Sequence, residues 1–197
     1  MKLPTNLDII QLLNSIFKNS NRLTQEANSF PIATMLTCCD HRVNPIPINS
    51  EGIFTIRNIG NQIINTEGSV DFGVEVLKTP ILFILGHANC KAVEAATQGN
   101  LTSFGTIDKE INTITTSAKN VNEAIVENVN LQIGHATEKY KNKIDDEKLV
   151  VVGAIYDFCN DFGLGHDSII LTNVNGTTES NKLKSTYQDK LSKYKFL

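Results

Sequence analysis

Short apolar runs recur along this chain and are separated by longer segments in which apolar and polar residues are mixed. Runs of four to eight apolar residues with many β-branched side chains are typical of buried strands. We therefore predict strands over residues 32–37, 53–56, 81–85 and 149–156, and a shorter edge strand over 168–172.

Between these runs, apolar residues recur three or four positions apart, as they do on the buried face of an amphipathic helix. This spacing predicts a helix over 68–78 capped by Ser69, a helix over 91–97, and a polar helical region between 106 and 143. A first helix within about residues 5–20 carries an apolar stripe, which must be buried on its own domain or on a neighbouring subunit. The Lys-rich end from Glu179 onward is predicted to be helical or frayed.

Strands that alternate with helices favour an α/β fold, in which a mostly parallel β-sheet is flanked by α-helices. The sequence shows no internal repeat and no low-complexity linker, so we expect a single domain over 1–197 with an N-terminal helical arm. Open sheets of this kind bind their ligands at the carboxyl ends of the strands. The residues just after each predicted strand are therefore the candidates for a ligand site.

Composition and net charge are those of an ordinary globular protein. The 197 residues are 41% hydrophobic with a formal net charge of −3, which gives no argument for nucleic acid or a membrane as a partner. The first residues lack the long apolar core and cleavage site of a secretory leader, so we expect a cytoplasmic protein. Its four cysteines then fit metal ligands, core residues or reactive thiols better than disulfides.

A histidine and a cysteine follow the strand predicted over 81–85. His87 and Cys90 lie three residues apart in the turn, a spacing that supplies half of a zinc site. Cys38 follows the strand predicted over 32–37, and it can complete a Cys₂His set if the two strands are neighbours. Three protein ligands with a fourth position left to water are the arrangement of catalytic zinc. The alternative is a small core cysteine beside a solvated histidine.

Asp40 and Arg42 lie two and four residues beyond Cys38. In an extended turn Asp40 shares the side of Cys38, and Arg42 can hold its carboxylate through two hydrogen bonds. A carboxylate held in this way can accept a hydrogen bond from a zinc-bound hydroxide. For these two residues alone, a surface ion pair is the alternative.

Four segments together resemble the β-class carbonic anhydrases. They are Cys38-x-Asp40-x-Arg42, Arg57-Asn58-x-x-Asn61, Gly86-His87-x-x-Cys90 and the run over 151–157. The resemblance implies Zn²⁺ on Cys38, His87 and Cys90, with Asp40 and Arg42 as catalytic residues. It implies reversible hydration of CO₂ to bicarbonate and a proton by zinc-bound hydroxide. It also implies a homodimer or homotetramer with the active site at the subunit boundary.

The chain departs from the family pattern at several positions near these motifs. His41 replaces the usual serine and is either a proton shuttle or a plain loop residue; Lys91 replaces the usual glycine and either faces the pocket or points to solvent. Asn49 is a possible stand-in for a glutamine that faces substrate in plant-like members. Cys39 is predicted to pack in the core and Cys159 to be structural, and His135 and His166 to have surface or loop roles.

These departures leave two alternative functions open. One is hydrolysis of a CO₂ isostere, carbonyl sulfide or carbon disulfide, on the same zinc site. The other is a non-catalytic zinc-binding homologue in which a side chain closes the fourth position.

Overall fold

The computed structural model describes residues 13–14, 31–43, 52–99, 104–189, 191 and 194–197. Its strands are β1 (Ala33–Cys38), β2 (Ile53–Asn58), β3 (Ile81–His87), β4 (Val150–Asp157), β5 (Ser168–Val174) and β6 (Tyr194–Phe196). Its α-helices are α2 (Glu67–Asp71), α3 (Lys91–Gln98), α4 (Gly105–Ile111), α5 (Val121–Lys139), α6 (Lys141–Asp145) and α7 (Ser180–Tyr187). Short 3₁₀ turns follow β1 and β2, and a π-helix, η4 (Phe72–Val76), continues α2.

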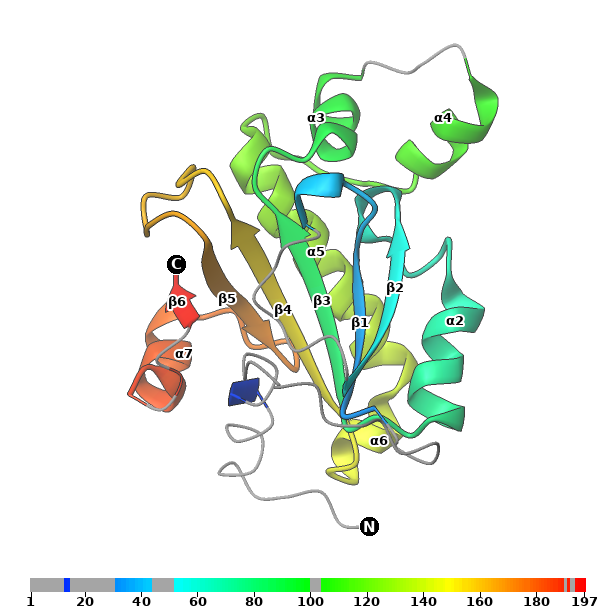
Figure 1. Cartoon of the computed structure of the whole chain (residues 1–197), viewed down its shortest axis with the longest axis vertical. Helices are drawn as coiled ribbons and strands as arrows, with labels where there is room; N and C mark the ends of the chain where they lie inside the picture. Colours follow the sequence, from blue (N-terminus) through cyan, green and yellow to red (C-terminus); the bar gives the residue numbers. More distant parts are fainter. Residues whose placement is uncertain (1–12, 15–30, 44–51, 100–103, 190, 192–193) are drawn as a thin grey trace.

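The six strands form one sheet in the order β2-β1-β3-β4-β5-β6 (Figure 1). Strands β2, β1, β3 and β4 are parallel, β5 runs antiparallel to β4, and β6 is parallel to β5. The predicted α/β class with a mostly parallel sheet is confirmed. Because β1 and β3 are adjacent and parallel, their carboxyl ends meet at the same edge of the sheet.

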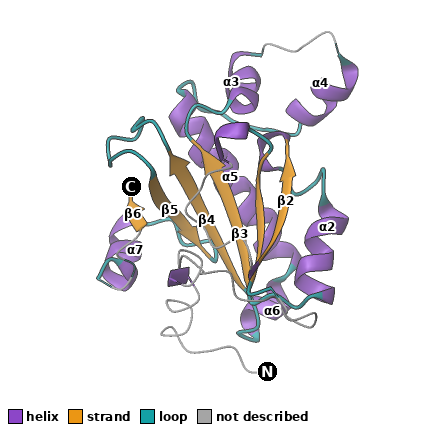
Figure 2. Cartoon of the chain, viewed as in Figure 1, coloured by secondary structure: helices purple, strands orange, loops and turns teal. Residues whose placement is uncertain are grey.

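Helices cover both faces of the sheet, and each face carries its own hydrophobic core (Figure 2). Alternate residues of β3 enter opposite cores, with Phe83 on one face and Leu82 and Ile84 on the other. The Leu82 face is covered by α5 and α2, and the Phe83 face packs with residues of α7 and with Leu13. Every residue of four strands is buried, which is why these strands appear in the sequence as mostly apolar runs.

Several predicted boundaries were wrong, and each error has a physical reason. The segment over 168–172 is not an edge strand, because the three residues of β6 pair beyond it and are too few to give a recognisable pattern. The helix predicted over 68–78 begins at Glu67 and becomes a π-helix after Asp71, so Ser69 lies inside it rather than at its cap. The region between 106 and 143 divides into α4, α5 and α6, with a non-helical stretch over 112–120.

The N-terminal helix predicted within 5–20 falls almost entirely outside the described residues. Of that segment the structure describes Leu13 and Asn14, both helical. Leu13 is completely buried, and its carbonyl oxygen accepts a hydrogen bond of 3.2 Å from the hydroxyl of Tyr194. This residue is therefore part of the core that lies under α7.

Strand β3 extends two residues beyond the predicted end, through Gly86 to His87. The glycine is needed there because α5 crosses the strand closely: a Cβ at Gly86 would lie 2.7 Å from Cγ2 of Val129. Helix α5 itself begins at Val121 and is capped by Asn120, whose side chain accepts a hydrogen bond of 2.8 Å from the backbone N–H of Asn122. The close contact with α5 supports the strand immediately before its histidine.

Two glycines of the α2–η4 segment should respond oppositely to alanine. A Cβ at Gly73 would collide with the side chain of Thr34, which is completely buried and shares a hydrogen bond of 2.8 Å with Thr79. We expect Gly73→Ala to lower the free energy of unfolding by about 1–3 kcal/mol. Nothing lies within 4 Å of a Cβ at Gly68, so Gly68→Ala should be neutral or raise it by up to about 1 kcal/mol. Urea denaturation of both variants checks this, and equal stabilities would contradict it.

No helix in the described part of the chain is both long and apolar enough to cross a membrane.

Candidate metal centre

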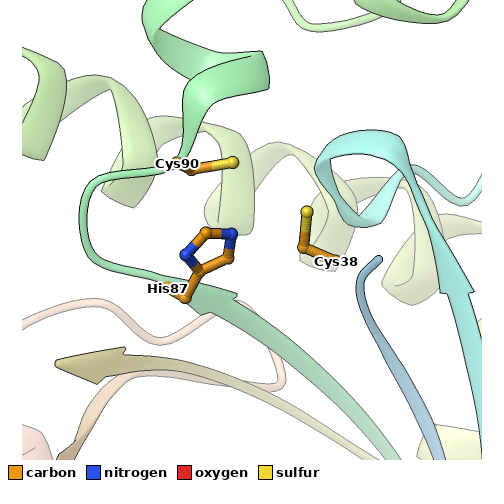
Figure 3. Close-up of side chains that lie close together, drawn as sticks. All are labelled: Cys38, His87 and Cys90. Atoms are coloured by element: carbon orange, nitrogen blue, oxygen red, sulfur yellow. The ribbon is translucent and has the colours of Figure 1, made fainter. Parts of the chain in front are cut away.

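Three side chains from two neighbouring strand ends converge on one space above the sheet (Figure 3). Cys38 is the last residue of β1, His87 is the last residue of β3, and Cys90 stands at the N-cap position of α3. One potential ligand atom from each of the three lies within 4.8 Å of the other two. The structure thus brings together the set that the sequence predicted from two separate motifs.

The imidazole of His87 is arranged as a metal ligand. Its Nδ1 lies 2.8 Å from the carbonyl oxygen of Ala88. Because a carbonyl can only accept, Nδ1 carries the proton, and Nε2 presents a lone pair. Nε2 is buried and has no hydrogen-bond partner in the part of the chain that the structure describes. A buried acceptor without a partner is costly, and a cation held jointly with the two sulfurs would satisfy it.

The two thiols are buried and interact strongly with each other. Cys38 is 4% exposed and Cys90 is 2% exposed, and both are free cysteines. The interaction with Cys90 lowers the pKa of Cys38, against the effect of burial, which raises it. The same interaction and burial raise the pKa of Cys90 well above its ordinary value. A cation held between the two sulfurs would stabilise both as thiolates.

Arg42 holds the carboxylate of Asp40 in the predicted two-pronged way. Its Nε donates to Oδ1 at 2.9 Å and its Nη2 donates to Oδ2 at 2.7 Å, and its backbone N–H donates to Oδ1 at 2.9 Å. These side-chain hydrogen bonds keep the pKa of Asp40 well below its ordinary value. Asp40 is not in the ligand cluster found among the described residues.

Arg42 also ties the two ligand-bearing segments together. Its Nη2 donates a hydrogen bond of 3.0 Å to the carbonyl oxygen of Asn89, which lies in the turn between His87 and Cys90. One guanidinium therefore bonds both to the segment that follows Cys38 and to the segment that carries the other two ligands. A lysine could not make this set of contacts, because it lacks the planar fork of donors.

Arg57 supports the same segment from β2. Its Nε donates to the carbonyl oxygen of Cys38 at 3.0 Å, and its Nη2 donates to that of Asp40 at 2.6 Å. In the sequence this arginine belongs to the Arg57-Asn58-x-x-Asn61 segment of the family resemblance. The β1–β2 pairing, which places Arg57 opposite Thr37, explains how it reaches these carbonyl groups.

The other predicted site residues lie on the surface or outside the described residues. The side chain of His41 is 92% exposed, with Nδ1 3.7 Å from Oδ1 of Asp40. Lys91 points to solvent and pairs with Glu94 at 2.6 Å. Asn49 lies outside the described residues. Cys39 is exposed, so its predicted place in the core was wrong: consecutive residues point to opposite sides, and Cys38 takes the buried one.

The remaining candidates are not members of the Cys38–His87–Cys90 cluster found among the described residues. Cys159 is half-buried, with its sulfur 3.8 Å from Oδ1 of Asp157. His135 and His166 are exposed, as the sequence predicted. A groove of about 420 Å³ between α2 and α5 is lined by His135 and Glu67 but by none of the three ligands. Charged side chains line this groove, and it is separate from the metal centre because none of the three ligands lines it.

Comparison with known proteins agrees with this geometry. A family model described as carbonic anhydrase matches residues 33–161. A carbonic anhydrase of Mycolicibacterium smegmatis is 38% identical over 69 residues, which are 33% of this chain and 34% of that protein. Carbonic anhydrase 2 of Mycobacterium tuberculosis is 36% identical over 74 residues, which are 36% of each chain. The chain thus spans about a third of the length of the curated relatives it matches.

Solved structures show the same fold at lower identity. A β-carbonic anhydrase of Coccomyxa in complex with acetazolamide has a TM-score of 0.60 and 18% identity, covering 81% of this chain and 79% of that one. A tetrameric β-carbonic anhydrase of the filamentous ascomycete Sordaria macrospora has a TM-score of 0.56 and 21% identity, covering 66% of this chain and 77% of that one. The residues that the family model matches, 33–161, include both ligand-bearing motifs.

Proposed function

Because this chain belongs to the β-class carbonic anhydrase family, we propose that it catalyses the reversible hydration of CO₂ to bicarbonate and a proton, with Zn²⁺ held by Cys38, His87 and Cys90. The observation that carries the proposal is the convergence of two buried sulfurs with an imidazole nitrogen that has no hydrogen-bond partner among the described residues. This N and S donor set suits zinc. β-Class carbonic anhydrases use zinc as their metal.

Three protein ligands support a catalytic rather than a structural site. Structural zinc sites are closed by four protein ligands, whereas catalytic sites leave a position for water or substrate. The carboxylate of Asp40, which could otherwise close the shell, instead has both oxygens bonded to Arg42. This arrangement favours an enzyme over the non-catalytic alternative.

Three residues beside the metal site have separate roles in the proposed hydration reaction: Asp40, Arg42 and His41. Bound Zn²⁺ supplies a water of lowered pKa as the nucleophile toward CO₂. Asp40, kept ionised by Arg42, can only accept a hydrogen bond, so it orients the proton of the nucleophile and leaves a lone pair for the substrate carbon. Arg42 holds that carboxylate in a fixed plane. His41, exposed beside Asp40, is a candidate for passing protons to solvent.

Self-association is part of the proposal. The solved relative from Sordaria macrospora is tetrameric. In this chain β2 forms one edge of the sheet, and Phe72 and Val76 on the adjoining η4 are 47% and 59% exposed. Exposed apolar side chains beside a strand edge are typical of subunit contacts. Light scattering should therefore give a dimeric or tetrameric mass, and a monomeric mass would contradict this part.

We also propose a cytoplasmic location, which cell fractionation would test. A reducing compartment keeps the thiols of Cys38 and Cys90 available as metal ligands.

The decisive experiment is metal analysis combined with stopped-flow CO₂ hydration on the purified chain. We expect about one zinc per chain, loss of hydration after chelation, and recovery when Zn²⁺ is returned. A rate no better than buffer with zinc bound would overturn the proposal. Carbonyl sulfide offered to the same preparation separates the isostere alternative, since faster sulfide release than CO₂ hydration would favour that substrate.

A further inference from the structure

One aromatic ring touches both the metal ligand and the arginine that holds Asp40. Phe158 directly follows β4, in which Tyr156 pairs with His87 of β3. The ring of Phe158 is stacked on the imidazole of His87, with centroids 6.2 Å apart and an interplanar angle of 28°. On the same ring, Cζ of Arg42 lies 4.8 Å from the centroid.

Both contacts are directional, unlike ordinary apolar packing. A guanidinium within about 6 Å of a ring centroid is attracted to the electron-rich face. Offset stacking of two flat rings at this separation favours a limited range of plane orientations. The two contacts therefore restrain the rotation of the imidazole and the position of the guanidinium against one ring.

Phe158 is itself held firmly. Its ring contacts Tyr156 at a centroid distance of 5.9 Å and packs on the core that contains Phe83. The preceding Asp157 is completely buried, and its carboxylate accepts hydrogen bonds of 2.9 Å from the backbone N–H groups of Asp161 and Phe162. The backbone around Phe158 is thus held by hydrogen bonds that involve none of the three ligands.

We propose that Phe158 is a positioning residue, whose aromatic face sets the imidazole of His87 and the guanidinium of Arg42 relative to each other. Through Arg42 it also places the carboxylate of Asp40, because both oxygens of that carboxylate bond to the guanidinium. This inference rests on the proposed function in one respect: the proposed function identifies the bound metal as Zn²⁺. A residue that merely filled the core would need volume but not an aromatic face.

Metal binding by three variants of the full chain separates these roles. Phe158→Leu removes the aromatic face, Phe158→Tyr keeps it, and Phe162→Leu alters a nearby half-buried phenylalanine that packs on the opposite core. We expect Phe158→Leu to weaken Zn²⁺ binding about 10-fold in chelator competition, the size of effect seen when groups supporting a ligand are lost. The visible absorption of the Co²⁺-loaded form should shift as well. Phe158→Tyr and Phe162→Leu should bind Zn²⁺ within about twofold of the parent chain.

Several outcomes would overturn the inference. They are unchanged affinity and spectrum in Phe158→Leu, an equal loss in Phe158→Tyr, or an equal loss in Phe162→Leu. Phe158→Met is made as a second non-aromatic variant, and failure of both it and the Leu variant to fold would assign the ring to the core instead. These readouts need no CO₂ turnover, so a chain inactive toward CO₂ would overturn the proposed function while leaving this result interpretable.

Discussion

Cys38→Ser should abolish tight zinc binding and lower CO₂ hydration by at least about 100-fold, since loss of a direct ligand must exceed the 10–100-fold cost of losing a supporting group. Serine keeps nearly the same shape but cannot supply a thiolate, which is the form that binds the metal. The remaining His87 and Cys90 would be a two-ligand site. Zinc content by elemental analysis and stopped-flow hydration measure the two effects on one preparation.

The adjacent cysteine provides a matched control for this change. Cys39 has the same chemistry and lies one residue away, but its side chain is exposed rather than buried in the ligand set. Cys39→Ser should therefore retain zinc and activity. If Cys38→Ser still bound one zinc with parental affinity, or if Cys39→Ser lost it, the assignment of the ligands would fail.

Asp40→Asn is expected to separate metal binding from turnover. Asparagine keeps the size of the side chain, but it loses the charge and the second acceptor oxygen that Arg42 now binds. Its amide can also donate a hydrogen bond, so it no longer imposes one orientation on the nucleophile's proton. We expect zinc content to stay near one per chain while kcat/KM falls by about 10²–10⁴, the usual contribution of a positioned acid–base group.

A second partly buried carboxylate tests whether loss of any such charge lowers kcat/KM. Asp71 on α2 accepts hydrogen bonds from Lys139 at 2.9 Å and from Tyr140 at 2.6 Å, and it belongs to no part of the metal centre. Asp71→Asn should change stability modestly and leave hydration unchanged. Full activity in Asp40→Asn, or an equal loss in Asp71→Asn, would show that Asp40 has no special part in turnover.

The ligand set was predictable because short motifs at strand ends carry it. His87 and Cys90 follow one apolar run and Cys38 follows another, and adjacent parallel strands deliver their ends to one edge. The Asp40–Arg42 contact was equally accessible, since it joins residues two apart in the chain.

Features that depend on contacts between distant segments were not predictable. Phe158 meets His87 only because β3 and β4 pair in one particular register, and no local pattern specifies that register. The role of Arg57 depends likewise on the pairing of β1 with β2. The three residues of β6 are too few to show a period. The burial of Cys39 was predicted from its residue type alone. That prediction failed because the adjacent Cys38 points into the protein and Cys39 therefore points to solvent.

The adjacency of β1 and β3 has a consequence for how the protein matures. These strands are neighbours in the sheet although β2 and α2 separate them along the chain. The cysteine of one and the histidine of the other meet only after the crossover between them has closed. A metal ion therefore finds its full coordination cage only in a chain whose central topology is complete, and metal uptake should be a late event in biogenesis rather than its nucleus.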